Sequence, residues 1–231
     1  MECNRQEVFL GKESLDKIQD TVIAIVGLGS LGSRHADALA RLGIKKLILI
    51  DNDTVKQENM STQLYSKDDL GKTKAEATAD NVKRINPDAE TTVINERLTA
   101  ENKSILDADL IIDGTDNYDT RYVINDYCVD NDIPWVMGAC LRSQGMTASF
   151  IPDRPCLRCV MPVEPTTEEN ACNQGVLGET ASVCSSLQIA QMISIISGKS
   201  NNSMITFDIL EPKFDIVKMQ RRQECYCTGK W

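Results

Sequence analysis

A continuous apolar run that ends in a glycine-rich loop constrains the fold of this chain more than any other feature. Residues 21–26 are mostly β-branched or aliphatic, as expected of a strand that is buried on both faces of a sheet. The glycine-rich loop, residues 27–32, follows directly, and a helical pattern then extends from about residue 30 to residue 42. A second apolar strand over 46–50 completes a strand–helix–strand unit, which predicts a parallel sheet.

The same alternation continues along the chain. We expect further strands over 92–95, 110–113 and 135–137, and helices over 73–85 and 120–130. After Gly138 the pattern changes, with strands expected over 146–151, 204–207 and 214–218 and one apolar helix over 182–196. Residues 152–178 contain four prolines and are expected to form one long loop. The predicted fold is α/β: a Rossmann-like, doubly wound, mostly parallel sheet that antiparallel C-terminal strands extend.

Composition limits the classes of partner. With 231 residues, 42% of them hydrophobic, the chain can bury a substantial single core. Its formal net charge of -9 argues against nucleic acid as the main partner, because phosphate binding needs clustered lysines and arginines. No apolar run approaches the roughly 20 residues that a membrane span requires, and the segment 1–5 does not resemble a secretory signal. We therefore expect a cytoplasmic protein with no membrane partner.

The glycine loop predicts a nucleotide site. Gly27 would allow a tight turn, Gly29 would let the backbone approach a phosphate, and Gly32 would allow close packing of the helix. Asp51 ends the second strand, where a carboxylate can accept hydrogen bonds from ribose hydroxyls. These residues suit NAD and ATP equally well.

Two cysteine doublets predict a metal site. The chain has nine cysteines, an odd number, and no export signal, so metal binding or catalysis fits better than a disulfide framework. Cys156 with Cys159, and Cys225 with Cys227, would supply four thiolates to a closed tetrahedral Zn²⁺ site. A redox pair is the alternative for a Cys-x-x-Cys motif, but the surrounding sequence is not thioredoxin-like. Zinc here would pin the C-terminal tail to the long loop.

Several further motifs, in order, resemble those of the ThiF, MoeB and HesA family of E1-like enzymes. The stretches that carry the resemblance are 4–6, 51–55, 58–60, 71–75, 113–117, 141–145 and 171–178, together with the cysteine doublets. The resemblance implies an adenylyltransferase that uses ATP and Mg²⁺ to activate the C-terminal glycine of a ubiquitin-like or sulfur-carrier protein. It also implies one domain, with an N-terminal arm and helix over 1–20, a nucleotide-binding half over 21–138 and a carrier-binding half with the zinc site over 139–231.

The resemblance assigns roles to individual residues. Asp51 and Asp53 would bind the nucleotide, Asn59 and Lys74 would lie near its phosphates, and Asp116 would bind Mg²⁺, which prefers carboxylate oxygens. Arg5 would reach the active site of a second subunit, which implies a homodimer. Cys172 lies where family members carry a cysteine that can join the partner covalently; an inert loop thiol is the alternative. The expected partner is a small protein with a C-terminal Gly-Gly, and a sulfur donor would be a separate protein.

One position departs from the family pattern. Thr62 stands where an arginine is usual, and Lys67 or Lys72 is the expected source of a replacement charge. This departure leaves open a non-catalytic carrier-binding subunit, and an NAD-dependent oxidoreductase would share the glycine loop. His35 is expected to be structural or solvated, with no evident partner. Three further cysteines are expected to be small buried hydrophobic residues: Cys128, Cys140 and Cys184.

Overall fold

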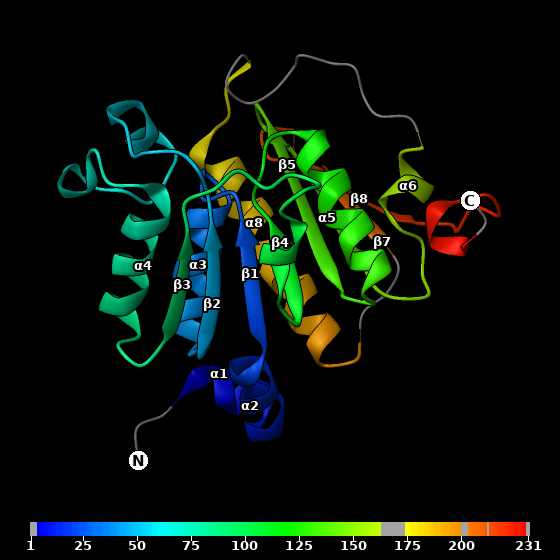
Figure 1. Ribbon diagram of the computed structural model, residues 1–231, viewed down its shortest axis with the longest axis horizontal. Coiled ribbons are helices and arrows are strands. Elements are labelled where there is room, and N and C mark those ends of the chain that lie inside the picture. Colours follow the sequence, from blue (N-terminus) through cyan, green and yellow to red (C-terminus); the bar gives the residue numbers. More distant parts are fainter. Residues whose placement is uncertain (1–3, 163–173, 200–202, 212, 230–231) are drawn as a thin grey trace.

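An eight-stranded mixed sheet forms the centre of the computed structural model, which describes residues 4–162, 174–199, 203–211 and 213–229. The strands lie in the order β3-β2-β1-β4-β5-β6-β7-β8 (Figure 1). Neighbours from β3 to β5 pair in parallel, and those from β5 to β8 pair antiparallel. The strands are β1 (Val22–Val26), β2 (Lys46–Ile50), β3 (Glu90–Ile94), β4 (Leu110–Asp113), β5 (Trp135–Leu141), β6 (Gln144–Phe150), β7 (Ser203–Asp208) and β8 (Lys213–Lys218).

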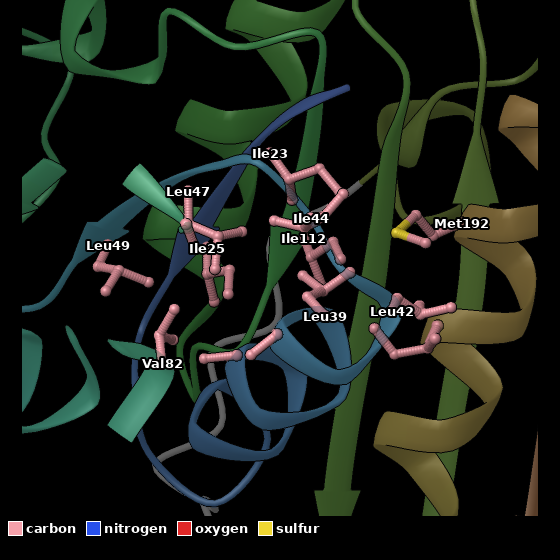
Figure 2. Close-up of a cluster of buried hydrophobic side chains, with 14 of the residues drawn as sticks. Ile23, Ile25, Leu39, Leu42, Ile44, Leu47, Leu49, Val82, Ile112 and Met192 are labelled. Atoms are coloured by element: carbon pink, nitrogen blue, oxygen red, sulfur yellow. The ribbon is translucent and has the colours of Figure 1, made fainter. Parts of the chain in front are cut away.

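Helices cover both faces of the parallel part, as the continuous apolar strands require. One face packs against α3 (Gly32–Leu42), α4 (Lys74–Ile85) and α8 (Gly178–Ile196). Figure 2 shows this cluster, in which Leu39, Val82 and Met192 come from those three helices and meet strand residues such as Ile25 and Leu47. The opposite face packs against α5 (Tyr118–Asp130) and α6 (Leu157–Val160). The predicted doubly wound α/β fold is confirmed.

Two short helices precede the sheet. They are α1 (Arg5–Leu10) and α2 (Lys12–Asp20), and they lie at the end of the molecule away from the arrowheads of the parallel strands (Figure 1). Leu15 and Ile18 of α2 are buried in the core, whereas α1 has no buried residue. Short 3-10 turns complete the described secondary structure: η1 (Gln57–Ser61), η2 (Lys67–Asp69), η3 (Lys103–Leu106) and η4 (Tyr226–Thr228). No helix within the described ranges is long and apolar enough to cross a membrane.

Most predicted elements agree with the structure to within a few residues, with three differences. β5 continues to Leu141 instead of ending at 137. Residues 138–140 carry little apolar bulk, but this half of the strand pairs with β6 in a hairpin. α8 begins at Gly178, four residues before the predicted start, after an extended residue at Leu177. The predicted loop over 152–178 contains α6, and its residues 163–173 lie outside the described ranges.

Candidate active site

A cavity of about 1010 Å³ opens at the carboxyl ends of β1, β2 and β4, where the order of the parallel strands reverses. Open α/β sheets bind their ligands at such a switch point. At this end the lining includes Gly27, Gly29, Ser30, Asp51, Asp53, Asn59, Lys74 and Asp116. The cavity then continues over the antiparallel strands, where Gln144, Met146, Thr206, Asp208, Lys213 and Asp215 line it. It therefore joins the predicted nucleotide residues to the C-terminal half of the sheet.

The glycine loop has the geometry that its sequence predicts. Gly27 has a φ of +80°, and a Cβ there would lie 2.9 Å from the carbonyl carbon of Gly114. A Cβ on Gly32 would overlap the carbonyl oxygen of Gly27. Gly29 differs, because it lines the cavity and a Cβ there would meet only Gln63 Nε2, at 3.9 Å. No side chain caps the N-terminus of α3, but the N–H groups of Ser33 and Arg34 already donate to the carbonyl oxygens of Gly29 and Leu31. An anion at the cavity wall would therefore meet the loop that precedes the helix and the positive end of the helix dipole.

Asp51 is fixed by the backbone around it. Its Oδ2 accepts a hydrogen bond from the N–H of Leu28 at 2.6 Å, and its Oδ1 accepts one from the N–H of Asp53 at 2.8 Å. Burial raises the pKa of Asp51, while Lys74 and the two amides act in the opposite direction. Each carboxylate oxygen keeps a second lone-pair direction, so the side chain can still accept from hydroxyl groups.

Tyr65 supports the glycine loop from behind, a role that sequence analysis missed. Its hydroxyl donates to the carbonyl oxygen of Leu28 at 2.6 Å and lies 3.1 Å from Thr78 Oγ1 on α4. Burial raises the pKa of Tyr65 well above its ordinary value, so the phenol stays protonated. No motif surrounds this tyrosine, and only the packing of α4 against the loop reveals the contact.

Lys74 and Asp53 form an ion pair at the cavity wall. Lys74 is the first residue of α4, and its Nζ lies 2.8 Å from Asp53 Oδ2. The N-cap of this helix, Thr73, accepts from the N–H of Glu76. The lysine side chain is 9% exposed, whereas that of Asp53 is 61% exposed, so the cation is fixed while its partner faces solvent. Nearby, Asn59 Oδ1 accepts from the N–H of Lys56 at 2.8 Å, so its NH₂ is the group that can donate to an anion.

Asp116 lies in the loop between β4 and α5 and lines the cavity. The loop follows Asp113, the last residue of β4, whose carboxylate forms an ion pair with Arg121 of α5, with 2.9 Å between Oδ2 and Nε. It ends at Asn117, whose side chain accepts from the N–H of Thr120 and caps α5. Sequence analysis named Asp116 but not the buried pair behind it.

His35 is fully buried, which agrees with the structural one of its two expected roles, and it has a partner that the sequence did not show. Its Nε2 lies 2.9 Å from Oε1 of Gln188 on α8, and Gln188 Nε2 donates to the carbonyl oxygens of Asp113 and Val136 at 2.8 and 3.3 Å. Burial lowers the pKa of His35 to about 3, so the ring is neutral and its Nε2–H donates to Gln188. The pair links α3 to the end of β4. It could not be predicted because 153 residues separate its members in sequence.

The surroundings of Thr62 also correct an expectation. Neither Lys67 nor Lys72 lines the cavity, and Lys72 instead pairs with Asp80 at 2.8 Å. The nearest cation is Arg34 of α3, which donates to the carbonyl oxygens of Thr62 and Ser30 and to Ser182 Oγ. Arg34 does not line the cavity; the cations that do, among the described residues, are Lys56, Lys74, Arg97, Arg121 and Lys213.

The four cysteines of the predicted zinc site meet in space. The Sγ atoms of Cys156 and Cys225 are 3.6 Å apart, those of Cys159 and Cys227 are 3.5 Å apart, and all four lie within 4.8 Å of one another. A tetrahedral site with Zn–S bonds of about 2.3 Å has S···S edges of about 3.8 Å. All four thiols are free, and burial raises the pKa of Cys159 to about 11. The donor set therefore fits a metal whose charge would stabilise the thiolates.

The remaining predicted residues lie elsewhere. Arg5 is exposed at the start of α1. Helix α1 lies at the end of the molecule away from the arrowheads of the parallel strands (Figure 1), whereas the cavity lies at their carboxyl ends. Cys172 lies outside the described residues. Cys128 and Cys184 are buried, as expected, whereas Cys140 is only half-buried and lines the cavity.

Sequence and structure comparisons place this geometry among known proteins. The sequence pattern of the ThiF family matches residues 3–228. The SAMP-activating enzyme E1 of Haloferax volcanii is 28% identical over 229 residues, which cover 96% of this chain and 85% of that protein. The sulfur carrier protein ThiS adenylyltransferase of Escherichia coli is 31% identical, covering 97% of this chain and 93% of that protein. The molybdopterin-synthase adenylyltransferase of the same organism is 30% identical, and the match covers 98% of this chain and 95% of that protein.

Among solved structures, Escherichia coli MccB with MccA-N7isoASN superposes with a TM-score of 0.82. The match covers 94% of this chain and 69% of that chain at 24% identity, so it supports the fold alone. By the family match over nearly its whole length, the chain belongs to the ThiF family and, like its named relatives at about 30% identity, it is an adenylyltransferase.

Proposed function

We propose that this chain uses ATP and Mg²⁺ to adenylate the C-terminal glycine of a small ubiquitin-like or sulfur-carrier protein. The observation that carries the proposal is the continuity of the cavity between the glycine loop and the antiparallel strands β6–β8. At about 1010 Å³ it reaches the upper end of the range for small-ligand pockets, about 300 to 1,000 Å³. The glycine-loop end suits the nucleotide, and the other end gives an extended peptide tail room to reach it.

The residues at the glycine-loop end fit ATP. In this proposal Asp51 accepts from the ribose hydroxyls, the first turn of α3 faces the phosphates, and Asn59 and Lys74 donate to them. Lys74 has three N–H donors and can keep its bond to Asp53 while it contacts a phosphate. Asp116 is a hard oxygen ligand at the cavity wall, which suits Mg²⁺. Bound Mg²⁺ would supply charge neutralisation and orient the phosphate oxygens.

The reaction requires two negative groups to approach each other. A carboxylate oxygen of the partner's terminal glycine bonds to the α-phosphorus of ATP, and the bond to the bridging oxygen breaks, which releases pyrophosphate and leaves an acyl-adenylate. Catalysis of such a transfer consists mainly of positioning and charge stabilisation. Lys74 is well placed for this because its ammonium is largely buried and an ion pair fixes it at the cavity wall.

The relatives support a carrier-protein substrate without selecting one carrier. One named relative acts on the sulfur carrier ThiS and another on molybdopterin synthase, and a solved neighbour is a complex of MccB with a form of MccA. For this chain we propose a partner with a C-terminal Gly-Gly, a homodimeric assembly and a structural Zn²⁺ held by the four clustered cysteines. An NAD-dependent oxidoreductase would leave the zinc cysteines, Lys74 and Asp116 without a role.

ATP–pyrophosphate exchange tests the proposal. With a panel of Gly-Gly carriers that includes ThiS, Lys74→Ala and Asp116→Asn should each lower exchange by roughly 10²- to 10³-fold, because each removes a group that acts on phosphate charge. Lys72→Ala and Asp119→Asn are matched controls, since both residues are close in sequence but do not line the cavity. Exchange at the parental rate in both site variants would contradict the proposal.

A further inference from the structure

Two buried charged side chains meet where β4 ends. Asp113 is fully buried, Arg121 is 4% exposed, and Arg121 Nε donates to Asp113 Oδ2 at 2.9 Å. Burying such a pair has a large desolvation cost, so an ion pair in this position is weak evidence of a stabilising role. The other hydrogen bonds of these two side chains indicate a second role for the pair.

Both members of the pair hold Thr115, the residue directly before Asp116. Asp113 Oδ1 accepts from the N–H of Thr115 at 2.8 Å and from its hydroxyl at 2.6 Å. Arg121 Nη2 donates to the carbonyl oxygen of Thr115 at 2.6 Å and to that of Gly138 on β5 at 2.8 Å. The backbone of Thr115 is therefore fixed through both its N–H and its C=O, and its side chain through its hydroxyl.

The surroundings fix the guanidinium and the far end of the loop. Arg121 lies over the ring of Tyr118, 5.0 Å from its centroid, and Asp113 raises the pKa of Arg121 although burial acts to lower it. Asn117, one residue after Asp116, is fixed by capping α5. Asp116, which lines the cavity, thus lies between two residues that hydrogen bonds hold in place.

We propose that Arg121 is a positioning residue that fixes the loop 114–117, through Asp113 and the carbonyl oxygen of Thr115, and so presets the Asp116 carboxylate for a divalent cation. The inference rests on the proposed function, in which Asp116 faces the Mg²⁺ of bound ATP. Outer partners of metal-binding carboxylates commonly affect metal affinity without contacting the metal.

Arg121→Lys tests this role because it keeps the charge but removes the planar fork that reaches Asp113, Thr115 and Gly138 together. The matched control is Arg158→Lys. Arg158 also bonds to a carboxylate, that of Asp126 at 2.8 and 2.7 Å, and also lies over a tyrosine ring, but it does not line the cavity.

Three measurements distinguish positioning from simple support of the fold. ATP affinity is measured by calorimetry with Mg²⁺ and with EDTA, amide hydrogen exchange is followed in the peptide that contains 114–117, and kcat and KM for MgATP are compared. In Arg121→Lys, ATP affinity in EDTA should be unchanged, while the gain in affinity from Mg²⁺ should fall by about 10- to 100-fold. The 114–117 amides should exchange faster with no nucleotide present. Arg158→Lys should match the parent in all three measurements.

The proposal is overturned if Arg121→Lys keeps the parental gain from Mg²⁺, or if Arg158→Lys reduces that gain equally. If Arg121→Lys does not fold, Thr115→Val and Thr115→Ser decide, because valine lacks the hydroxyl that donates to Asp113 and serine retains it. Valine should then reproduce the loss and serine should rescue it, and equal behaviour of the two would overturn the proposal. If the parent binds ATP but exchanges no pyrophosphate with any carrier, the proposed function fails. The binding and hydrogen-exchange results still decide the role of Arg121.

Discussion

At the scale of single residues, the side chains that line the nucleotide end of the cavity depend on supports from distant parts of the chain. Asp51, Lys74 and Asp116 lie at the ends of predicted elements and all line the cavity. Their supports, such as Gln188 and Tyr65, come from distant elements and carry no spacing signal. A side chain directed at a ligand follows from its place on a strand or helix, whereas a hydrogen bond between elements depends on how those elements pack.

The surroundings of Thr62 in the structure change the interpretation of this position. The threonine lies behind the glycine loop, with its Oγ1 accepting from Ser30 Oγ at 3.1 Å, and Ser30 lines the cavity. Neither Lys67 nor Lys72 lines the cavity there. Arg34 is the cation beside Thr62, but its N–H groups bond to Ser30, Thr62 and Ser182. In the proposed site, an arginine at position 62 would begin beside Ser30, which lines the cavity, and would displace no described cavity lysine.

Thr62→Arg should accordingly raise the rate of acyl-adenylate formation and leave ATP affinity nearly unchanged. An interaction made mainly in the transition state acts on the rate. One charged hydrogen bond of about 1.5 to 3 kcal/mol corresponds to a gain on the order of 10- to 100-fold. Single-turnover measurements with one carrier would give the rate, and Thr62→Gln provides a long, uncharged control. A rate equal to that of the parent would show that position 62 is not a catalytic deficit.

At the scale of secondary-structure elements, the apolar strands were the most predictable part of the fold. The predicted strands 46–50 and 110–113 match β2 and β4 because continuous burial leaves a clear apolar signal. The extension of β5 gave no such signal, because Gly138 and Cys140 become strand only by pairing with β6. The cysteine doublets were predicted as a site, and the second doublet, with one residue between its cysteines, meets the first at the turn η4.

Metal analysis tests the role of that cluster. Freshly purified protein should contain about one Zn²⁺ per chain, since four thiolates saturate a tetrahedral structural site. Replacing Cys225 and Cys227 with serine should release the ion and lower the melting temperature, because a metal held by the four cysteines would tie the C-terminal turn η4 to α6. Cys128→Ser is the matched control, as Cys128 is also a buried thiol but is not one of the four. Protein without zinc, or zinc retained by the double variant, would refute the assignment.

At the scale of the whole molecule, the position of Arg5 bears on the proposed assembly. The parallel strands direct their carboxyl ends to the cavity, whereas α1 lies at the other end of the molecule (Figure 1). Arg5 therefore cannot serve the cavity of its own chain in this arrangement. Val8 and Phe9 of the same helix are 77% and 87% exposed, which leaves α1 with an uncovered apolar surface. Both features fit a two-fold dimer in which α1 packs against the second subunit.

Subunit mixing tests completion of the site in trans. Arg5→Ala and Asp116→Asn should each be inactive alone. In a heterodimer of the two, the Arg5→Ala chain keeps Asp116 and receives Arg5 from its partner, so one of the two sites is intact. Random exchange in an equal mixture makes about half of the dimers heterodimers, so about a quarter of the sites should recover activity. If Arg5 acted within its own chain, both sites of the heterodimer would be defective and nothing would recover.

A second mixture tests the same arrangement through a loss of activity instead of a recovery. The double variant Arg5→Ala/Asp116→Asn is mixed with an equal amount of parent chain. With completion in trans, each heterodimer has one site without Arg5 and one without Asp116, so activity should fall to about half of what the parent chains had alone, since only parent homodimers remain active. With completion within one chain, the parent site of each heterodimer works and total activity should not change. Recovery in the first mixture together with this loss in the second establishes that Arg5 completes the site of the partner chain. No change in either mixture, when mass spectrometry demonstrates subunit exchange, excludes it.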